Sequence, residues 1–517
     1  MSSPRLTAST AAIGWHEMSV AQPQYDRSSL TPGIVHIGVG NFHRAHMAAY
    51  LDDLFALGVD HEWAILGAGV RPADAAMREA LGQQDWLSTV IELNPAAKRA
   101  RRIGAMIDFI EVDATNATLI AAMSRPEIRI VSLTVTEGGY FIDPATGQFD
   151  PTAEDITADS RTPDCPGTAF GAIVAALRIR RDAGQMPFTV LSCDNLSGNG
   201  DAAKAATVGL ARLSDSDLAD WIDANVSFPN SMVDRIAPAT GRRERAIASA
   251  LGFANDMVPV TCEPFRQWVI EDRFPSGRPA LEKVGATFTD HVHAFETMKI
   301  RILNGGHAVL GYAGAMKGVE FVHEAMTDPT IAAFLDKIET EEILPIVPPV
   351  PGQDLLDYKR VVFERFSNPE IADTVHRLCF DGSNRQPKFV LPSIRDNLSK
   401  GVIARGLILE CALWCRYCYG VDERGQEITP NDPNWNQLTT VARDARSRPS
   451  RWIEMRAIYG DLSDHPEFAE TFAEALDLVW MRGAELAMRQ YIEHCPDTPS
   501  TVLPTTPALG RTSEGIE

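Results

Sequence analysis

The chain has 517 residues, of which 45% are hydrophobic and 23% charged, which is ordinary usage for a folded protein with more than one domain. Its formal net charge of −21 at pH 7 disfavours binding to nucleic-acid phosphates or to anionic membrane surfaces. No stretch has the roughly 20 consecutive apolar residues that span a bilayer, and the start lacks the apolar segment of a signal peptide, so we expect a cytoplasmic protein.

The first predicted elements are a strand over 33–37 and a helix over 41–51, joined by a turn that contains Gly38 and Gly40. Such glycines let a backbone approach a pyrophosphate, and the first-turn N–H groups of a helix favour its negative charge. His43 stands where a third glycine is usual, so an ordinary tight turn remains an alternative. The residues that we expect to contact a dinucleotide here are Gly38, Gly40, Asn41, Phe42 and Arg44.

A second strand is predicted over 63–70, and the residue that follows such a strand meets the adenosine ribose of a dinucleotide. A carboxylate there binds the 2′-hydroxyl and repels a 2′-phosphate, so Asp74 favours NAD. Arg71 in the same turn could tolerate NADP. We expect NAD.

Strands over 128–135 and 188–193 continue the first half, with helices over 168–184 and 200–213. This alternation predicts an α/β fold with a doubly wound, Rossmann-type parallel sheet, in a domain over 1–285. Ligands of such sheets bind at the carboxyl ends of the strands, where Glu137 and Asn195 fall.

The second half, over 286–517, is predicted to be a mostly helical substrate-binding domain with a frayed tail from 496. The proline-rich stretch 345–351 is predicted to be a loop. The predicted helices cover 286–316, 329–342, 402–419, 435–446, 449–459 and 466–493.

The eight cysteines are too sparse for a disulfide framework, and we expect free thiols. Cys411, Cys415 and Cys418 have helical spacings that could bring sulfur ligands together. Their segment is strongly apolar, so buried packing is favoured over a metal site. His43 with His46, and His291 with His293, lack further ligands nearby, and no metal site is predicted.

The most informative run is 298–307, because Lys299, Asn304 and His307 share one face of the predicted helix with Glu296. Oxidation of a secondary alcohol needs a base for the hydroxyl proton and donors for the developing alkoxide, and a buried lysine can be that base. Lysine has no redox capacity, so this chemistry needs a cofactor, and it needs no metal.

Six segments resemble the polyol-specific long-chain dehydrogenase/reductase family, in its mannitol 2-dehydrogenase group. They keep the order of the family and extend over about residues 30 to 400. The segments are Gly-Val-Gly-Asn-Phe-His-Arg-Ala-His at 38–46, Thr-Glu-Gly-Gly-Tyr at 136–140, Ser-Cys-Asp-Asn-Leu at 192–196, Phe-Pro-Asn-Ser-Met-Val-Asp-Arg-Ile at 228–236, the lysine run, and Asn-Arg-Gln-Pro-Lys-Phe at 384–389.

The resemblance implies roles for residues whose plainer interpretations are a turn, a surface ion pair or a solvated loop. It makes Lys299 the base, Asn195 and Asn304 a side-chain oxyanion hole, His307 a substrate contact and Glu296 the gate that passes the proton to water. It makes Asp234, Arg377 and Arg385 substrate-binding residues, and Asn195 also a cofactor contact. The family often has lysine in place of Arg385, which keeps the charge but changes the donor geometry.

The resemblance therefore implies a metal-independent, NAD-dependent enzyme that interconverts D-mannitol and D-fructose, with a polyol or ketose as its small-molecule partner. A uronate reductase acting on fructuronate or tagaturonate, and an arabinitol dehydrogenase, are alternatives within the family. A catalytically silent NAD-binding sensor is the alternative of another class, although it would not need the proton relay of Lys299 and Glu296. No heptad pattern indicates an oligomer, and the family implies a monomer.

Overall fold

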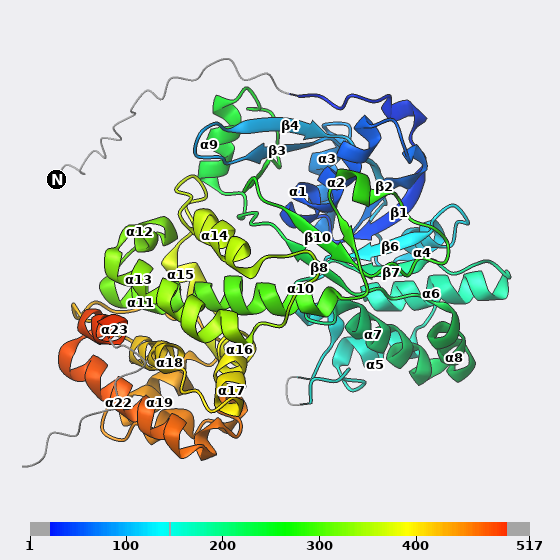
Figure 1. Cartoon of the computed structure of the whole chain (residues 1–517). Helices are drawn as coiled ribbons and strands as arrows, with labels where there is room; N and C mark the ends of the chain where they lie inside the picture. Colours follow the sequence, from blue (N-terminus) through cyan, green and yellow to red (C-terminus); the bar gives the residue numbers. More distant parts are fainter. Residues whose placement is uncertain (1–20, 144–145, 494–517) are drawn as a thin grey trace, which may run out of the picture.

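The computed structural model describes residues 21–143 and 146–493. Its first half is built on a five-stranded parallel sheet in the order β5-β2-β1-β6-β7 (Figure 1). Four of these strands are almost entirely buried, which explains why they are largely apolar rather than alternating, whereas the edge strand β5 exposes Asp108. The strands are β1 (Pro32–Ile37), β2 (Ala64–Ala68), β5 (Met106–Phe109), β6 (Ile130–Leu133) and β7 (Thr189–Ser192).

Helices cover both faces of this sheet, as a doubly wound fold requires, and the predicted Rossmann-type class is confirmed. Val35 and Ile37 of β1 belong to the core under α4, α6 and α7, whereas Ile34 belongs to the core under α2. The helices of this half are α1 (Asn41–Ala45), α2 (Met47–Ala56), α3 (Asp74–Gly82), α4 (Ala117–Met123), α5 (Glu154–Arg161), α6 (Ala169–Asp182), α7 (Asn199–Ser214), α8 (Ser216–Asn225) and α9 (Arg242–Ala250).

Two small mixed sheets, with orders β4-β3-β9 and β11-β10-β8, were not predicted. β11 lies inside the segment predicted as a helix over 286–316. This part of the chain forms a strand because it pairs in parallel with β10. Short 3₁₀ turns complete this half at η1 (Arg27–Ser29), η2 (His61–Trp63), η3 (Glu137–Tyr140) and η4 (Leu281–Val284). The strands are β3 (Ser88–Glu92), β4 (Arg99–Ile103), β8 (Ser231–Asp234), β9 (Val260–Cys262), β10 (Gln267–Ile270) and β11 (Thr287–Phe288).

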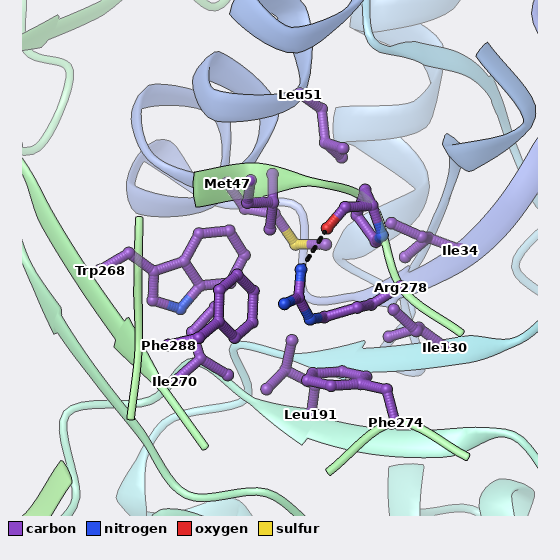
Figure 2. A pocket seen from close by; sticks show the side chains of 12 residues that line it. Ile34, Met47, Leu51, Ile130, Leu191, Trp268, Ile270, Phe274, Arg278 and Phe288 are labelled. Carbon is purple, nitrogen blue, oxygen red and sulfur yellow. Dashed lines mark hydrogen bonds between the residues drawn. The ribbon is translucent and has the colours of Figure 1, made fainter. Parts of the chain in front are cut away.

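A layer formed by β10, β11 and η4 closes over one face of the large sheet, with a cavity of about 10 Å³ beneath it (Figure 2). The lining is apolar except for Arg278, whose guanidinium lies 3.4 Å from the centroid of the Phe288 ring and donates to the Pro279 carbonyl. This volume holds at most about one water molecule, so the cavity is a packing feature of the core.

The second half is helical and lies beside the sheet half, with α10 between them (Figure 1). Its central helix α18 is buried from Gly406 to Cys418. The elements are α10 (Val292–Met298), the π-helical turn η5 (Lys299–Asn304), α11 (Gly305–Lys317), α12 (Val322–Thr327), α13 (Pro329–Ile338), the π-helical turn η6 (Glu339–Ile343), η7 (Leu344–Ile346), α14 (Leu355–Phe366), α15 (Val375–Leu378), α16 (Gly382–Phe389), α17 (Leu391–Ser399), α18 (Arg405–Cys418), α19 (Trp435–Ala445), α20 (Ser450–Ile453), α21 (Arg456–Tyr459), η8 (Leu462–Asp464), α22 (Pro466–Arg482) and α23 (Ala484–Glu493).

Several predicted helices are broken in the structure. The helix predicted over 41–51 is interrupted at His46, and the one over 466–493 at Gly483, whose φ of 83° requires glycine. The segment 449–459 forms the two short helices α20 and α21. The tail predicted to fray, from 496, lies outside the described residues.

The cysteines within 21–143 and 146–493 are all free thiols, as predicted. Cys411, Cys415 and Cys418 are buried in α18 among apolar side chains, which agrees with core packing. Cys495 lies outside the described residues. No helix of the described part is long and apolar enough to cross a membrane.

Candidate active site

The side chain of Lys299 leaves the start of the π-helical turn η5 and reaches the carboxyl ends of two strands in the sheet half. Its Nζ donates to Asn195 Oδ1 at 2.6 Å, just after β7, and to the Val233 carbonyl at 2.7 Å in β8. The Lys299 amine therefore connects the helical half of the protein to the strand ends of the sheet half.

The Lys299 amine is buried, with 6% of the residue exposed. Burial lowers the pKa of Lys299 from its usual 10.5, since water no longer stabilises the ammonium form. The negative charge of Asp234 opposes this lowering, and the positive charge of Arg365 adds to it. The neutral amine, which can act as a base, is accordingly easier to form here than on a surface lysine.

The π-helical turn η5 runs from Lys299 to Asn304, within a segment predicted to be a regular α-helix. A wider turn of this kind inserts an extra residue into the helix and changes which side chains share a face. Asn304 is 9% exposed, and within the described part of the chain its side-chain amide has no hydrogen bond. That amide is free to donate to a ligand.

His307 follows in the first turns of α11, and its ring centroid lies 4.6 Å from that of Phe366. Its Nε2 is buried and has no hydrogen-bond partner among the described residues. Burial lowers the pKa of His307 well below its usual value, and the positive charges of Arg377 and Arg365 lower it further. The imidazole is therefore neutral at physiological pH.

Glu296 lies one turn before Lys299, with its carboxylate turned towards the loop that follows Asn195. It accepts hydrogen bonds from Ser197 Oγ at 3.1 Å and from the Gly198 N–H at 3.2 Å. The Nδ1 of His293, whose side chain is 86% exposed, lies 3.4 Å from Glu296 Oε2, the oxygen that also accepts from Ser197. Burial raises the pKa of Glu296, so this group can exchange protons between the interior and the solvent.

Asp234, at the end of β8, belongs to a buried charge cluster that sequence analysis missed. Arg365 of α14 makes two hydrogen bonds of 2.8 Å to the Asp234 carboxylate and two, at 2.8 and 2.9 Å, to Glu263. The one available signal was that Arg365 falls on the apolar stripe of its helix, in register with Tyr358 and Val362. Its partners are too distant in sequence to be inferred.

The predicted substrate arginines lie in and near α15 and α16. Arg377 forms an ion pair with Asp373, and Arg385 donates to the carbonyls of Arg377 at 3.3 Å and Leu378 at 3.4 Å. Burial, and then the charge of Arg377, lowers the pKa of Arg385. Lys388 is exposed and lies 3.4 Å from Glu137 of η3, so α16 reaches the sheet half near the end of β6.

A small cavity opens beside His307 in the helical half. Arg365, Phe366 and Asp373 contribute to its lining, together with His323, whose buried Nδ1 has no partner among the described residues. Its free volume is about 10 Å³, so it adjoins the site rather than holding a sugar-sized ligand.

The glycine turn after β1 has the shape that a dinucleotide needs. Gly38 has a φ of 101°, and a Cβ there would lie 2.2 Å from the Thr134 carbonyl oxygen, so only glycine fits. A Cβ at Gly40 would meet nothing closer than 4.0 Å, which leaves an open approach to the backbone. The turn lies where the strand order reverses between β1 and β6, the position at which such sheets bind dinucleotides.

The other predicted cofactor residues differ in exposure. The Arg44 side chain is buried and hydrogen-bonds Asn41 and the Gly40 carbonyl, so it supports the turn from inside the protein. Asn41 also donates to the Pro238 carbonyl at 2.9 Å. Phe42 stacks on His46, with ring centroids 4.8 Å apart.

Asp74 begins α3 and accepts from the N–H groups of Val70 and Arg71 at 3.1 and 3.0 Å. Its carboxylate thus holds the turn after β2 that would face the adenosine ribose. Glu137 is exposed at the end of β6. Within the described ranges, no group of three or more His, Cys, Asp or Glu side chains could hold a metal ion.

A doubly wound sheet with a glycine turn at its switch point, beside a buried lysine amine and unpaired side-chain donors, defines a dinucleotide-dependent oxidoreductase. Comparison with known proteins gives the family. The model of the mannitol dehydrogenase Rossmann domain matches residues 32–283, and that of the mannitol dehydrogenase C-terminal domain matches 291–480. The chain belongs to the mannitol dehydrogenase family, and the resemblance seen in the sequence is confirmed.

Individual relatives are similar over nearly the whole chain. A mannitol 2-dehydrogenase of Cereibacter sphaeroides is 64% identical over 92% of this chain and 99% of its own length. The structure of Pseudomonas fluorescens mannitol 2-dehydrogenase in a ternary complex with NAD and D-mannitol matches with a TM-score of 0.82 and 42% identity, covering 92% of this chain and 96% of that one. A D-sorbitol dehydrogenase in substrate-free form also has a TM-score of 0.82, with 34% identity over 91% of this chain and 97% of its own.

Proposed function

We propose that this protein is an NAD-dependent mannitol 2-dehydrogenase that interconverts D-mannitol and D-fructose, with Lys299 as a general base and without a metal ion. The 64% identical relative carries that name, and the 42% identical structure holds NAD with D-mannitol. The open backbone at Gly40 and the tight turn at Gly38, which only glycine can form, fit the pyrophosphate of NAD.

The hydrogen bonding of Lys299 is the observation that carries this proposal. A neutral amine has two N–H groups and one lone pair, and both N–H groups have acceptors in Asn195 Oδ1 and the Val233 carbonyl. The lone pair then points away from both acceptors and can take a proton from a substrate hydroxyl. In the reverse direction, the third N–H of the ammonium form returns that proton.

The two asparagines supply donors for the oxygen that loses its proton. Asn195 uses its Oδ1 for Lys299, which leaves its Nδ2 free to donate, and the Asn304 amide has no partner in the described part of the chain. Donors set in place before the reaction stabilise a developing alkoxide without reorganisation. NAD bound at the glycine turn of Gly38 and Gly40 would supply the hydride acceptor for the carbon that carries this oxygen.

The remaining residues orient the substrate and move the proton. The neutral His307 offers a buried ring nitrogen to a polyol hydroxyl. Glu296, between Ser197 and the exposed His293, carries the proton from Lys299 to water. Asp234, Arg377 and Arg385 complete the substrate pocket, and Gly38, Gly40, Asn41, Phe42, Arg44, Asp74, Glu137 and Asn195 form the cofactor side.

The uronate reductase alternative keeps the same base and oxyanion donors, but it would use Arg377 and Arg385 for a substrate carboxylate. Arg377 is already paired with Asp373, which favours a neutral ligand. We also infer a monomeric, cytoplasmic enzyme, which light scattering and cell fractionation would test.

The decisive experiment is a substrate panel. Purified protein is assayed for NADH formation with mannitol, sorbitol and arabinitol, and for NADH consumption with fructose, fructuronate and tagaturonate, with NADP(H) in parallel. We expect the highest kcat/KM for mannitol and fructose with NAD(H), and unchanged rates after exhaustive chelation. No turnover with any of these substrates, combined with tight NADH binding, would instead support the silent sensor, and zinc-restorable loss after chelation would contradict the metal-free mechanism.

A further inference from the structure

The buried cluster of Arg365, Asp234 and Glu263 joins the two halves of the protein directly behind the lysine. Arg365 comes from α14 in the helical half, Asp234 from the end of β8, and Glu263 from the residue after β9. The four hydrogen bonds are between 2.8 and 2.9 Å, and the three side chains are at most 5% exposed. Charge-assisted, bidentate hydrogen bonds of this kind fix the orientation of the three side chains as well as the placement of their charges.

The segment after α14 is anchored on the same surface as Arg365. The ring of Phe265 lies under the Arg365 guanidinium at 4.2 Å, and Asn368 donates to the Leu93 carbonyl at 2.9 Å. Lys98 forms an ion pair with Glu370 at 2.8 Å. Arg365 is therefore the buried centre of a docked helix rather than a lone side chain.

The cluster leads to the base through consecutive residues. Asp234 follows Val233 in β8, and the Val233 carbonyl is one of the two acceptors that hold the Lys299 amine. On its other side, Arg365 adjoins Phe366, which lies against the ring of His307. A shift of Arg365 would thus move both the acceptor of the base and the packing of the substrate-side histidine.

We propose that Arg365 is a positioning residue for the reaction, which docks α14 on β8, holds the Asp234 carboxylate in place and offsets its charge, and thereby fixes the place and the protonation of the Lys299 base. The inference rests on the proposed role of Lys299.

The charges around the base set the direction of the effect. Arg365 with Asp234 and Glu263 carries a net charge of −1 when all three are ionised, and the positive end of this cluster lowers the pKa of Lys299 while Asp234 raises it. Without Arg365, two adjacent carboxylates cannot both stay ionised, and Glu263, whose pKa burial raises, takes the proton. The charge that remains on Asp234 would then act on Lys299 without the opposing charge of Arg365. The other titratable or charged groups that face the cluster or the base are Glu296, His307, Tyr358, Arg235, His46 and Tyr50. Glu339 acts in turn on Tyr358, and Glu92 forms an ion pair with Arg235.

The test compares the pH dependence of kcat/KM for polyol oxidation in Arg365→Gln and Asp234→Asn. The acid limb, where Lys299 loses its proton, should move to higher pH by about one unit in Arg365→Gln and to lower pH in Asp234→Asn. At a pH below the limb, a shift of one unit lowers the rate of Arg365→Gln about tenfold. A merely structural role would lower activity at all pH values without opposite shifts, and that result would overturn the proposal.

Matched variants and a second readout complete the design. Arg360 lies on the same helix but is exposed and paired with Asp357 and Glu364, so Arg360→Gln should keep the wild-type limb. Arg365→Lys keeps the positive charge, so the acid limb of its pH profile should return to the wild-type position. It loses the bidentate hydrogen bonds, which should lower kcat. NADH titration by fluorescence and thermal unfolding establish that each variant is folded.

If Arg365→Gln does not fold, Glu263→Gln takes its place. That variant leaves Arg365 paired with Asp234 alone, and its limb should move to lower pH; an unmoved limb would refute the proposal. The proposed function fails separately, because a wild-type protein that oxidises no polyol disproves the function, whereas a working wild type with unshifted variants disproves only the role of Arg365.

Discussion

Lys299 makes both of its hydrogen bonds to neutral oxygens, which is uncommon for a buried lysine. The nearest carboxylates, Asp234 and Glu296, act on it through space, while their own hydrogen bonds go to Arg365 and to the Ser197 loop. Neither acceptor supplies a full negative charge to retain the ammonium form. This arrangement keeps the amine close to losing its proton.

Replacing Lys299 by alanine removes the base without touching the glycine turn that faces the cofactor. We expect Lys299→Ala to lower kcat for mannitol oxidation by roughly 10²–10⁴-fold, while the Kd of NADH measured by fluorescence stays close to wild type. Lys283→Ala, at an exposed position, is the matched control. Turnover within a few-fold of wild type across the pH range would remove Lys299 from the mechanism.

The direction of the Lys299 pKa shift predicts opposite pH profiles for the two directions of reaction. Oxidation needs the neutral amine, so its rate should rise with pH through a pKa below the usual 10.5 and level off above it. Reduction needs the ammonium form and should fall as pH rises through the same region. Initial rates of mannitol oxidation and fructose reduction between pH 5 and 11 test this, and parallel profiles would contradict it.

For single residues, the sequence predicts a shared site when the residues are close together in the chain. It does not predict contacts between residues that are far apart in the chain. Lys299, Asn304, His307 and Glu296 are close in the chain, so their proximity in space follows from any helical conformation. The Val233 carbonyl carries no sequence signal because every residue has one. Glu263 and Arg365 are separated by about a hundred residues, and only the packed structure brings them together.

Among the elements, α16 places Arg385 at the C-terminal end of α15. There its guanidinium donates to main-chain carbonyls rather than to a carboxylate. Its guanidinium therefore keeps donors for substrate hydroxyls. Arg385→Lys should raise KM for mannitol several-fold with little change in kcat, since the lost contact binds the ground state and the transition state alike. Steady-state kinetics test this, with the exposed Lys388→Arg as control, and a fall in kcat at unchanged KM would argue for a role in the chemical step.

Helix α18 contains a buried acid with a thermodynamic consequence. Glu410 is fully buried, its Oε1 accepts from Gln386 at 2.6 Å, and its Oε2 has no partner among the described residues. Burial raises the pKa of Glu410 to about 8. The unfolded chain releases this proton near pH 4.5, so the folded state binds more protons between about pH 4.5 and 8, and stability falls with rising pH in that window.

Glu410→Gln should abolish this dependence. Relative to wild type, its free energy of unfolding should rise by about 1–2 kcal/mol between pH 6 and pH 8. Urea unfolding at the two pH values measures this, and Glu427→Gln at an exposed position of the same half is the control. A difference that does not change with pH would show that Glu410 ionises normally.

The helices and strands that were predicted correctly are those whose apolar pattern extends over many residues of the chain. The four predicted strands of the large sheet are apolar on both faces, and α6 and α18 are long and flanked by breaks, so all appear within a few residues of their expected bounds. The short strands β8, β9 and β10 have no such runs. The π-helical turns η5 and η6 depend on tertiary packing, because a wider turn loses local hydrogen-bond geometry that only neighbours can compensate.

For the whole molecule, a net charge of −21 acts on any charged substrate before it reaches the site. We expect mannitol and fructose to be turned over far better than fructuronate or tagaturonate. We also expect kcat/KM for a uronate to rise with added salt, because salt screens the repulsion, while kcat/KM for fructose stays constant. Rates from 10 to 300 mM NaCl test both points, and a preference for uronates would move the protein to the reductase branch.

The π-helical turn at Lys299–Asn304 has a further consequence for hydrogen exchange. It lies between α10 and α11 in the core of the helical half, where backbone amides are normally the slowest to exchange. At the end of the turn, the Gly305 N–H reaches back to the Ile300 carbonyl across a wider ring than an α-helical bond spans. A deuterium-labelling map should therefore show a fast-exchanging stretch inside a protected helix, at the position of the base, and substrate binding should slow it.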